Sequence, residues 1–204
     1  MNLYHGSNSV IEYPDLKESL PMKKTDYLVL LRGINVGGKN TIKMDDLKKA
    51  FEKMKFSDIK TYIQSGNVLF KDYENNKLKI AKRIEKKLFE MTQNEIMIKI
   101  LTFSDLHEII SDIPDGFGDE PEKYKYDVLF LIEPLTTKEI MTKIKIMKGN
   151  DKIYEGKKAF YVKRIAEKLT GSYITEITKT WQNVTVRNLN TTRKLHELML
   201  ERQR

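Results

Sequence analysis

The sequence predicts an α+β fold of two lobes with the same order of strands and helices. The continuous apolar run at residues 27–31 (YLVLL) is typical of a strand covered on both faces, and residues 126–132 (YDVLFLI) form a second such run. After each run, the spacing of apolar residues predicts a helix, two strands joined by a glycine-containing turn, a further helix and a closing strand. This βαββαβ order is the ferredoxin-like unit, so we expect two tandem ferredoxin-like lobes with antiparallel sheets, plus connecting and C-terminal helices.

In the first lobe, a helix is expected between the first and second strands. Apolar residues recur there every three or four positions from Met44 to Met54, and Thr41 is a candidate N-cap. Two β-rich runs then flank Ser65 and Gly66, which predicts a hairpin with a two-residue loop. The other expected elements are hairpin strands at residues 59–64 and 67–70, a helix at 76–91 and a strand at 96–101.

The second lobe repeats this pattern without visible sequence identity to the first. A connecting helix at residues 103–113, capped by Ser104, and a loop at 114–123 come before it. Its expected elements are a strand at 126–132, a helix at 137–147, hairpin strands at 152–155 and 159–163, a helix at 165–179 interrupted at Gly171, a strand at 184–187 and a helix from the cap Asn190 to Leu200.

We therefore expect an appended segment at residues 1–21, a first lobe with its connecting helix at 22–113, and a second lobe with its C-terminal helix at 114–204. The appended segment is acidic and ends at Pro21, just before Met22, which would suit a start of translation. Its string LYHGSNSVIEYPDL resembles the opening of a bacterial family related to ADP-ribosyltransferases. That family's catalytic domain does not follow, so the resemblance implies no activity. We expect this segment to be a loop or disordered.

The composition is typical of a soluble globular protein and excludes several kinds of site. Hydrophobic residues make up 40% of the chain and charged residues 32%, and no apolar run is long enough to cross a membrane. The absence of cysteine excludes disulfides, thiolate zinc sites and a cysteine nucleophile, and we expect a cytoplasmic protein without a cofactor. The three histidines lie far apart in the sequence, so we predict neither a metal site nor catalytic residues.

The formal charge of +8 is compatible with a polyanionic partner. Most of this charge comes from lysines spread over the expected solvated helix faces, and no arginine-rich or aromatic-interleaved stripe is present. The central strand of the first lobe also lacks the aromatic pattern of RNA-recognition domains. Non-specific nucleic-acid binding through diffuse lysine charge is one alternative function, and an enzyme acting on a nucleotide-like substrate is another.

Residues 27–40 combine a strand, a glycine-rich loop and a helix start, and the free backbone N–H groups of such a place favour an anion. The stretch nearly matches the phosphate-binding pattern G-x-x-x-x-G-K-[ST], since Gly33, Gly38 and Lys39 fit it. Position 40 is asparagine, so the hydroxyl that would hold Mg²⁺ is missing. Three interpretations stay open: a turn whose glycines serve packing, a non-catalytic anion site, and a nucleotide-hydrolysing P-loop.

The predicted topology brings this loop towards the turn of the first hairpin. In a split βαβ unit the first and second strands run parallel with the third between them, so their ends lie on one edge of the sheet, roughly 10 Å apart. We call this edge the rim, and we predict that it binds an anionic, for example phosphorylated, small molecule. The predicted ligand-binding residues of the rim are Arg32, Asn35, Gly37, Gly38, Lys39, Asn40, Gln64, Ser65 and Asn67.

Ser65 of the rim, together with Arg187 and Trp181, has a structural alternative to a ligand contact. Ser65 in the sequence Ser-Gly is typical of a turn. Arg187 is either a second anion contact or an ion-paired cap on the C-terminal helix. Trp181, the one tryptophan, is more typical of a core residue than of a stacking platform.

Three motifs, LLRGINVGGKN, TYIQSGNVLF and TVRNLNTTRKL, make the chain resemble the bacterial domain-of-unknown-function family 1697 from roughly Lys24 to the C-terminus. The resemblance implies two ferredoxin-like lobes in tandem, which argues against a P-loop ATPase with its mainly parallel sheet. This family has no assigned activity, so the resemblance implies no catalytic residue. The segment before Met22 departs from the usual family start.

Overall fold

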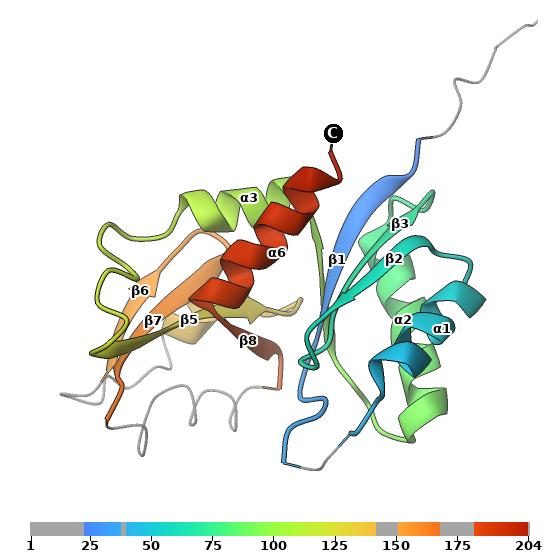
Figure 1. The fold of residues 1–204 in the computed structure, drawn as a ribbon, viewed down its shortest axis with the longest axis horizontal. Coiled ribbons are helices and arrows are strands. Elements are labelled where there is room, and N and C mark those ends of the chain that lie inside the picture. The colour runs from blue at the N-terminus through green and yellow to red at the C-terminus, as the bar shows by residue number, and fades with distance from the viewer. Residues whose placement is uncertain (1–22, 38–39, 142–150, 168–181, 204) are drawn as a thin grey trace, which may run out of the picture.

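The structure is a computed structural model that describes residues 23–37, 40–141, 151–167 and 182–203 (Figure 1). The first lobe contains β1 (Thr25–Leu31), α1 (Met44–Lys53), β2 (Ser57–Tyr62), β3 (Asn67–Asp72), α2 (Lys77–Thr92) and β4 (Ile98–Thr102). Then follow α3 (Phe103–Ser111), β5 (Tyr124–Leu131), α4 (Thr137–Met141), β6 (Asp151–Glu155), β7 (Ala159–Ile165), β8 (Val184–Asn188) and α6 (Leu189–Glu201). The appended segment, Trp181 and most of the helix expected at 165–179 lie outside the described residues, as does the second half of the helix expected at 137–147.

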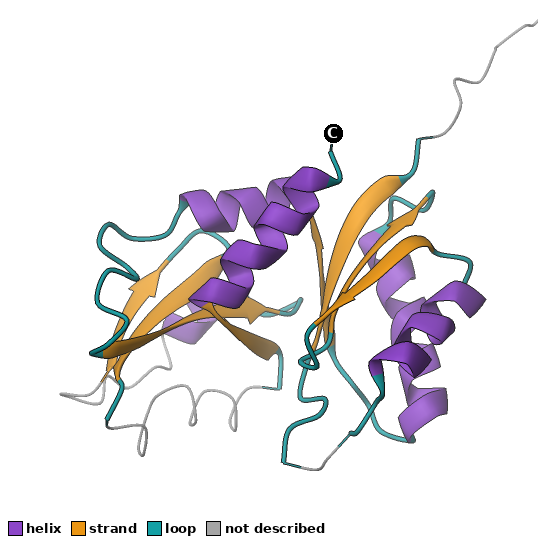
Figure 2. Ribbon diagram, in the orientation of Figure 1, coloured by secondary structure: helices purple, strands orange, loops and turns teal. Residues whose placement is uncertain are grey.

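Both sheets have the strand order of the ferredoxin-like unit, which confirms the predicted fold class. The first sheet runs β2-β3-β1-β4 and the second β6-β7-β5-β8, and every neighbouring pair is antiparallel. Since β3 lies between β1 and β2, the latter two run parallel, and the loops that follow them lie on one edge of the sheet. Figure 2 shows α1 and α2 together on the outer side of the first sheet, away from the second lobe.

Alternation along β1 gives the first sheet a different core on each face. Tyr27, Val29 and Leu31 pack in a core with residues of α1 and α2. Leu28 and Leu30 belong to a second core, which also contains residues of the second sheet, of α3 and of α6. The two lobes therefore share a core, and α3 and α6 lie side by side above it (Figure 1). A smaller third core covers the other face of the second sheet, beside Ile140 of α4.

Three predicted helix caps are wrong. The N-cap of α1 is Lys43 and not the predicted Thr41. The N-cap of α3 is Thr102 and not Ser104, and that of α6 is Asn188 and not Asn190. For α3 and α6 the observed cap is the last residue of the preceding strand, so strand and helix follow each other without the loop that the sequence interpretation assumed. At α3 the N–H groups of Thr102 and Asp105 are satisfied by a full capping box, in which each side chain accepts from the backbone of the other residue.

The β2–β3 turn is also longer than the predicted two residues, because it spans residues 63–66. Gly66 has a φ of +74°, and a Cβ there would lie 2.7 Å from Cβ of Leu31 and 2.8 Å from Cδ1 of Ile34. The close approach lets the carbonyl of Gly66 accept a hydrogen bond from the N–H of Leu31 at 2.8 Å. Only glycine combines this backbone conformation with this contact.

Candidate functional site

The structure brings the two loops of the rim into direct contact. The side-chain amide of Asn35 donates to the carbonyl of Gln64 at 2.9 Å and to that of Ile42 at 3.0 Å. The oxygen of the same side chain accepts from the N–H of Ile42 at 2.8 Å. The loops are thus closer than the ~10 Å expected from strand spacing alone. Because these hydrogen bonds of Asn35 stay within the protein, this side chain braces the rim.

The glycine-rich loop is built from residues in the left-handed region of backbone space. Gly33, Asn35, Gly37 and Asn40 have φ values between +49° and +64°. A Cβ on Gly33 or Gly37 would meet nothing within 4 Å, so these two glycines serve the path of the backbone and not close packing. The loop is closed by a hydrogen bond from the N–H of Asn35 to the carbonyl of Asn40 at 3.2 Å.

Two predicted residues of the other loop belong to a buried polar cluster. Asn67 is buried, and its amide donates to the Ser65 hydroxyl and to the Tyr62 carbonyl, each at 3.0 Å. Its oxygen accepts from Nε of Arg187 at 2.5 Å. Arg187 lies on β8, so this cluster joins the two lobes, and Ser65 serves the turn here.

Arg187 is a buried cation whose described partners are all neutral oxygens. Its guanidinium donates to the carbonyls of Leu31 at 2.9 Å and Ser65 at 2.8 Å, and to the Thr185 hydroxyl at 3.0 Å. Burial lowers the pKa of Arg187 to about 10. The interpretation as an ion-paired helix cap is wrong, because no carboxylate lies among its described partners. The three motifs that carry the family resemblance meet at this side chain.

Arg32 also reaches across the lobes. Its Nε donates to the carbonyl of Val184 on β8 at 3.0 Å, and burial lowers its pKa. Gln64 is exposed, whereas Gly38 and Lys39 lie outside the described residues. The described rim therefore acts as a joint between the lobes, and ligand binding at the rim stays a prediction.

A cavity of about 330 Å³ lies between β4, α3, the segment after β5 and the β6–β7 hairpin. We call it the interlobe cavity. Its lining includes the apolar residues Leu101, Ile109 and Leu131. Its charged lining residues are four lysines, Lys77, Lys99, Lys157 and Lys158, and two carboxylates, Asp105 and Glu133. The excess of positive charge beside an apolar wall suits an anionic ligand.

Two of the other cavities with charged lining residues suit an anionic ligand less well. The cavity of about 800 Å³ beside Arg32 has two basic and two acidic lining residues, so its charges balance. A cavity of about 660 Å³ at the start of β1 is basic. There, however, Lys71 and Arg202 both form ion pairs with Asp26 and Asp58.

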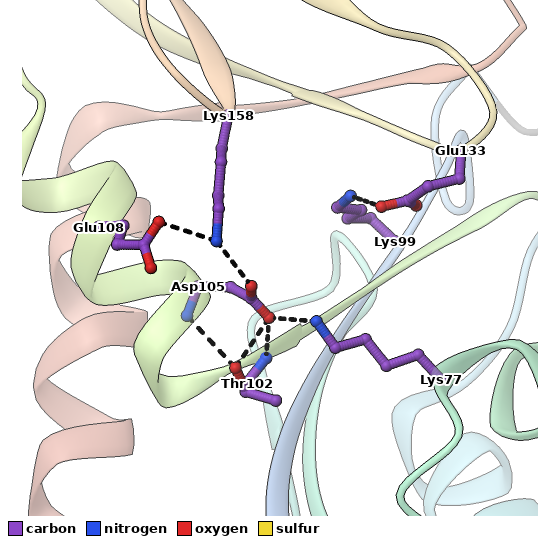
Figure 3. A network of polar contacts seen from close by, with 7 residues as sticks. All are labelled: Lys77, Lys99, Thr102, Asp105, Glu108, Glu133 and Lys158. Atoms are coloured by element: carbon purple, nitrogen blue, oxygen red, sulfur yellow. Dashed lines mark hydrogen bonds and ion pairs between the residues drawn. The ribbon is translucent and has the colours of Figure 1, made fainter.

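Asp105 is the fixed negative charge of the interlobe cavity (Figure 3). Its carboxylate accepts hydrogen bonds from the N–H and hydroxyl of Thr102 at 2.9 and 2.8 Å, from Lys158 at 3.1 Å and from Lys77. Burial alone would raise the pKa of Asp105, but these donors outweigh it and hold the pKa well below its usual value. Lys158 also pairs with Glu108 at 2.8 Å. The network links α2, α3 and the β6–β7 hairpin.

Lys99 and Glu133 form a separate ion pair in the same cavity (Figure 3). Nζ of Lys99 on β4 lies 2.5 Å from Oε1 of Glu133, which follows β5. The pair therefore spans the two lobes. The ammonium of Lys157 is exposed and has no partner among the described residues, although its backbone N–H donates to Asp112 at 2.7 Å.

One further contact, between two histidines, was not expected from the sequence. Nδ1 of His107 on α3 and Nε2 of His196 on α6 lie 3.0 Å apart, and the ring of Phe103 stacks with both. Burial, and secondly the neighbouring His107, lowers the pKa of His196. Within the described ranges, no group of three or more side chains could hold a metal ion.

Fold and site together define an α+β protein of two ferredoxin-like lobes that share a core and a buried arginine. A family model described as "Protein of unknown function (DUF1697)" matches residues 24–161, so the chain belongs to this family. A solved structure titled as that of the conserved bacterial protein SP0830 from Streptococcus pneumoniae is 22% identical in sequence. It aligns over 87% of this chain and 99% of its own, with a TM-score of 0.72. At this identity the likeness shows the fold alone.

No curated protein matches the chain. In the part of the chain that the structure describes, no helix has the length and apolar character needed to cross a membrane.

Proposed function

We propose that this protein binds a small anionic molecule in the interlobe cavity. The observation that carries the proposal is the convergence of Lys77, Lys99, Lys157 and Lys158 on one cavity of about 330 Å³. Its described lining residues include only two carboxylates. Charge-assisted hydrogen bonds from lysine to anionic oxygens are strong, and they strengthen further where a cavity wall excludes water. The volume suits a compact molecule with several anionic oxygens.

The donors of these lysines are not used up by the internal ion pairs. Each ammonium has three N–H donors. Lys77 and Lys99 each use one donor on a carboxylate, and Lys158 uses two. Lys157 uses none within the described residues. A ligand would therefore find several N–H donors from both lobes without breaking the Asp105 network.

Calorimetric titration of the full chain with pyrophosphate and with citrate tests the proposal. At least one probe should bind, and Lys99→Ala combined with Lys157→Ala should weaken that binding tenfold or more. The matched control is Lys48→Ala with Lys49→Ala, which removes two exposed lysines of α1 and gives the same change in net charge. The proposal fails if neither probe binds, or if the control weakens binding as much as the cavity variant.

The same experiment separates the alternatives. The rim is the other predicted location for an anion, and Lys39→Ala with Gln64→Ala would weaken binding if the ligand lies there. Short RNA titrated at low and high salt tests the nucleic-acid alternative. Binding that falls steeply with salt and is unaffected by the cavity variant would favour diffuse lysine charge instead.

A further inference from the structure

We infer that Glu133 occupies the place of a ligand anion on Lys99, so that a ligand enters the interlobe cavity by displacing this side chain. The inference rests on the proposed function and adds how that site is controlled. The protein holds the two carboxylates of the lining, Asp105 and Glu133, in different ways.

Asp105 is a permanent part of the cavity wall. Its side chain is mostly buried and accepts four hydrogen bonds, two of them from Thr102. It also closes the capping box of α3. Moving Asp105 would leave the partly buried donors of Thr102 and Lys77 without this acceptor and would uncap the helix, and both changes are costly. An incoming anion would therefore not displace this carboxylate.

Glu133 is held far more weakly. Its side chain is 68% exposed, and its carboxylate has one described partner, the ammonium of Lys99. The Lys99 side chain is only 12% exposed. A mostly buried ammonium requires an anionic partner, whereas an exposed carboxylate loses little free energy when it turns into water. Exchange of Glu133 for a ligand anion therefore satisfies Lys99 equally well and leaves Glu133 solvated.

This exchange selects ligands by the number of their anionic groups. A monoanion would only replace one carboxylate on Lys99 by another and gain little. A ligand with two or more anionic groups also reaches the exposed ammonium of Lys157 and the remaining donors of Lys77 and Lys158. The ligand class is therefore a compact di- or trianion, of either phosphate or carboxylate chemistry.

The test is calorimetric titration of the Glu133→Gln variant, which keeps the shape of the side chain and removes its charge. Pyrophosphate represents the phosphates, citrate the carboxylates and acetate the monoanions. The variant should bind the preferred probe about threefold to tenfold more tightly than the wild type, which corresponds to a lost competing ion pair at a partly exposed site. Glu90→Gln is the control, because it removes an exposed, ion-paired carboxylate on α2, outside the interlobe cavity, and changes the net charge equally. Adding Lys99→Ala to Glu133→Gln should abolish the gain.

The outcomes separate the two proposals. If the wild type binds a probe and Glu133→Gln binds it equally or more weakly, displacement is wrong while the proposed function stands. An equal gain for Glu90→Gln means that net charge, and not displacement, raises the affinity. If neither the wild type nor Glu133→Gln binds any probe, both proposals fail. Acetate binding as tightly as pyrophosphate and citrate overturns the ligand class. A melting temperature of Glu133→Gln close to that of the wild type verifies that the exposed substitution leaves the fold intact.

Discussion

Nε of Arg187 lies 2.5 Å from the side-chain oxygen of Asn67, and this hydrogen bond joins residues 120 positions apart that belong to different lobes. Both residues are buried. Within the described residues the guanidinium is surrounded by carbonyl, amide and hydroxyl oxygens instead of a carboxylate. A buried cation of this kind is stabilised by oriented dipoles, so it depends on every acceptor keeping its place.

Replacing Arg187 with methionine should lower the free energy of unfolding by roughly 2–4 kcal/mol, because several buried acceptors lose their donor. Urea unfolding followed by circular dichroism measures the change. Arg193→Met is the control, since Arg193 is exposed on α6, and its effect should stay within about 0.5 kcal/mol. Equal effects for the two variants would show that Arg187 does not hold the lobes together.

Gly66 in the β2–β3 turn and Gly33 in the loop after β1 form a matched pair of glycines. Gly66 and Gly33 have similar positive φ values, +74° and +64°, but a Cβ would clash with Leu31 and Ile34 only at Gly66. Gly33→Ala should therefore cost about 1–2 kcal/mol for the left-handed backbone alone. Gly66→Ala should cost roughly 1–3 kcal/mol more because of overpacking. The difference between the two variants in urea unfolding isolates the close contact, and a difference near zero would mean that the turn shifts freely.

The fold could be predicted from the sequence because its strongest signals are local. Continuous apolar runs marked β1 and β5, and the topology then placed the rim loops on one edge. The sequence does not reveal which way an amide faces, so Asn35 and Asn67 were predicted as ligand contacts although their hydrogen bonds lie inside the protein. The interlobe cavity depends on how α3 and the β6–β7 hairpin pack against β4, and no local pattern encodes that packing.

The histidine pair predicts that stability falls in mild acid. The folded-state pKa of His196 lies below the ordinary 6.5, so the unfolded chain binds the proton more tightly. Stability is therefore fully present above about pH 7 and decreases as the pH falls through 6.5 towards the lowered folded value. Urea unfolding between about pH 7.5 and about pH 5.5 measures this decrease.

The control for this prediction is His196→Gln, which removes the titrating group and keeps a side chain that can accept a hydrogen bond from His107. Its stability should change less over the same pH range than that of the wild type. If the variant and the wild type lose stability in parallel, the acid sensitivity belongs to other groups. A circular dichroism spectrum at each pH verifies that the loss is measured from the same folded state.

Asp105 predicts a second, separate pH dependence with a different window. Its folded-state pKa lies below the ordinary 3.8, so its contribution to stability is present above that value and is lost as the pH falls through the folded value. Asp105→Asn should lower the free energy of unfolding at neutral pH by about 1–3 kcal/mol, since Lys77 and Lys158 lose their shared carboxylate. The free energies of unfolding of the wild type and of Asp105→Asn should converge as the wild-type carboxylate becomes protonated in acid.

The control is Asp115→Asn, at an exposed position in the loop after α3. It should change neither the free energy of unfolding at neutral pH nor the dependence of that free energy on pH. Parallel curves for the wild type and Asp105→Asn down to strong acid would show that the lysine network does not depend on the charge of Asp105.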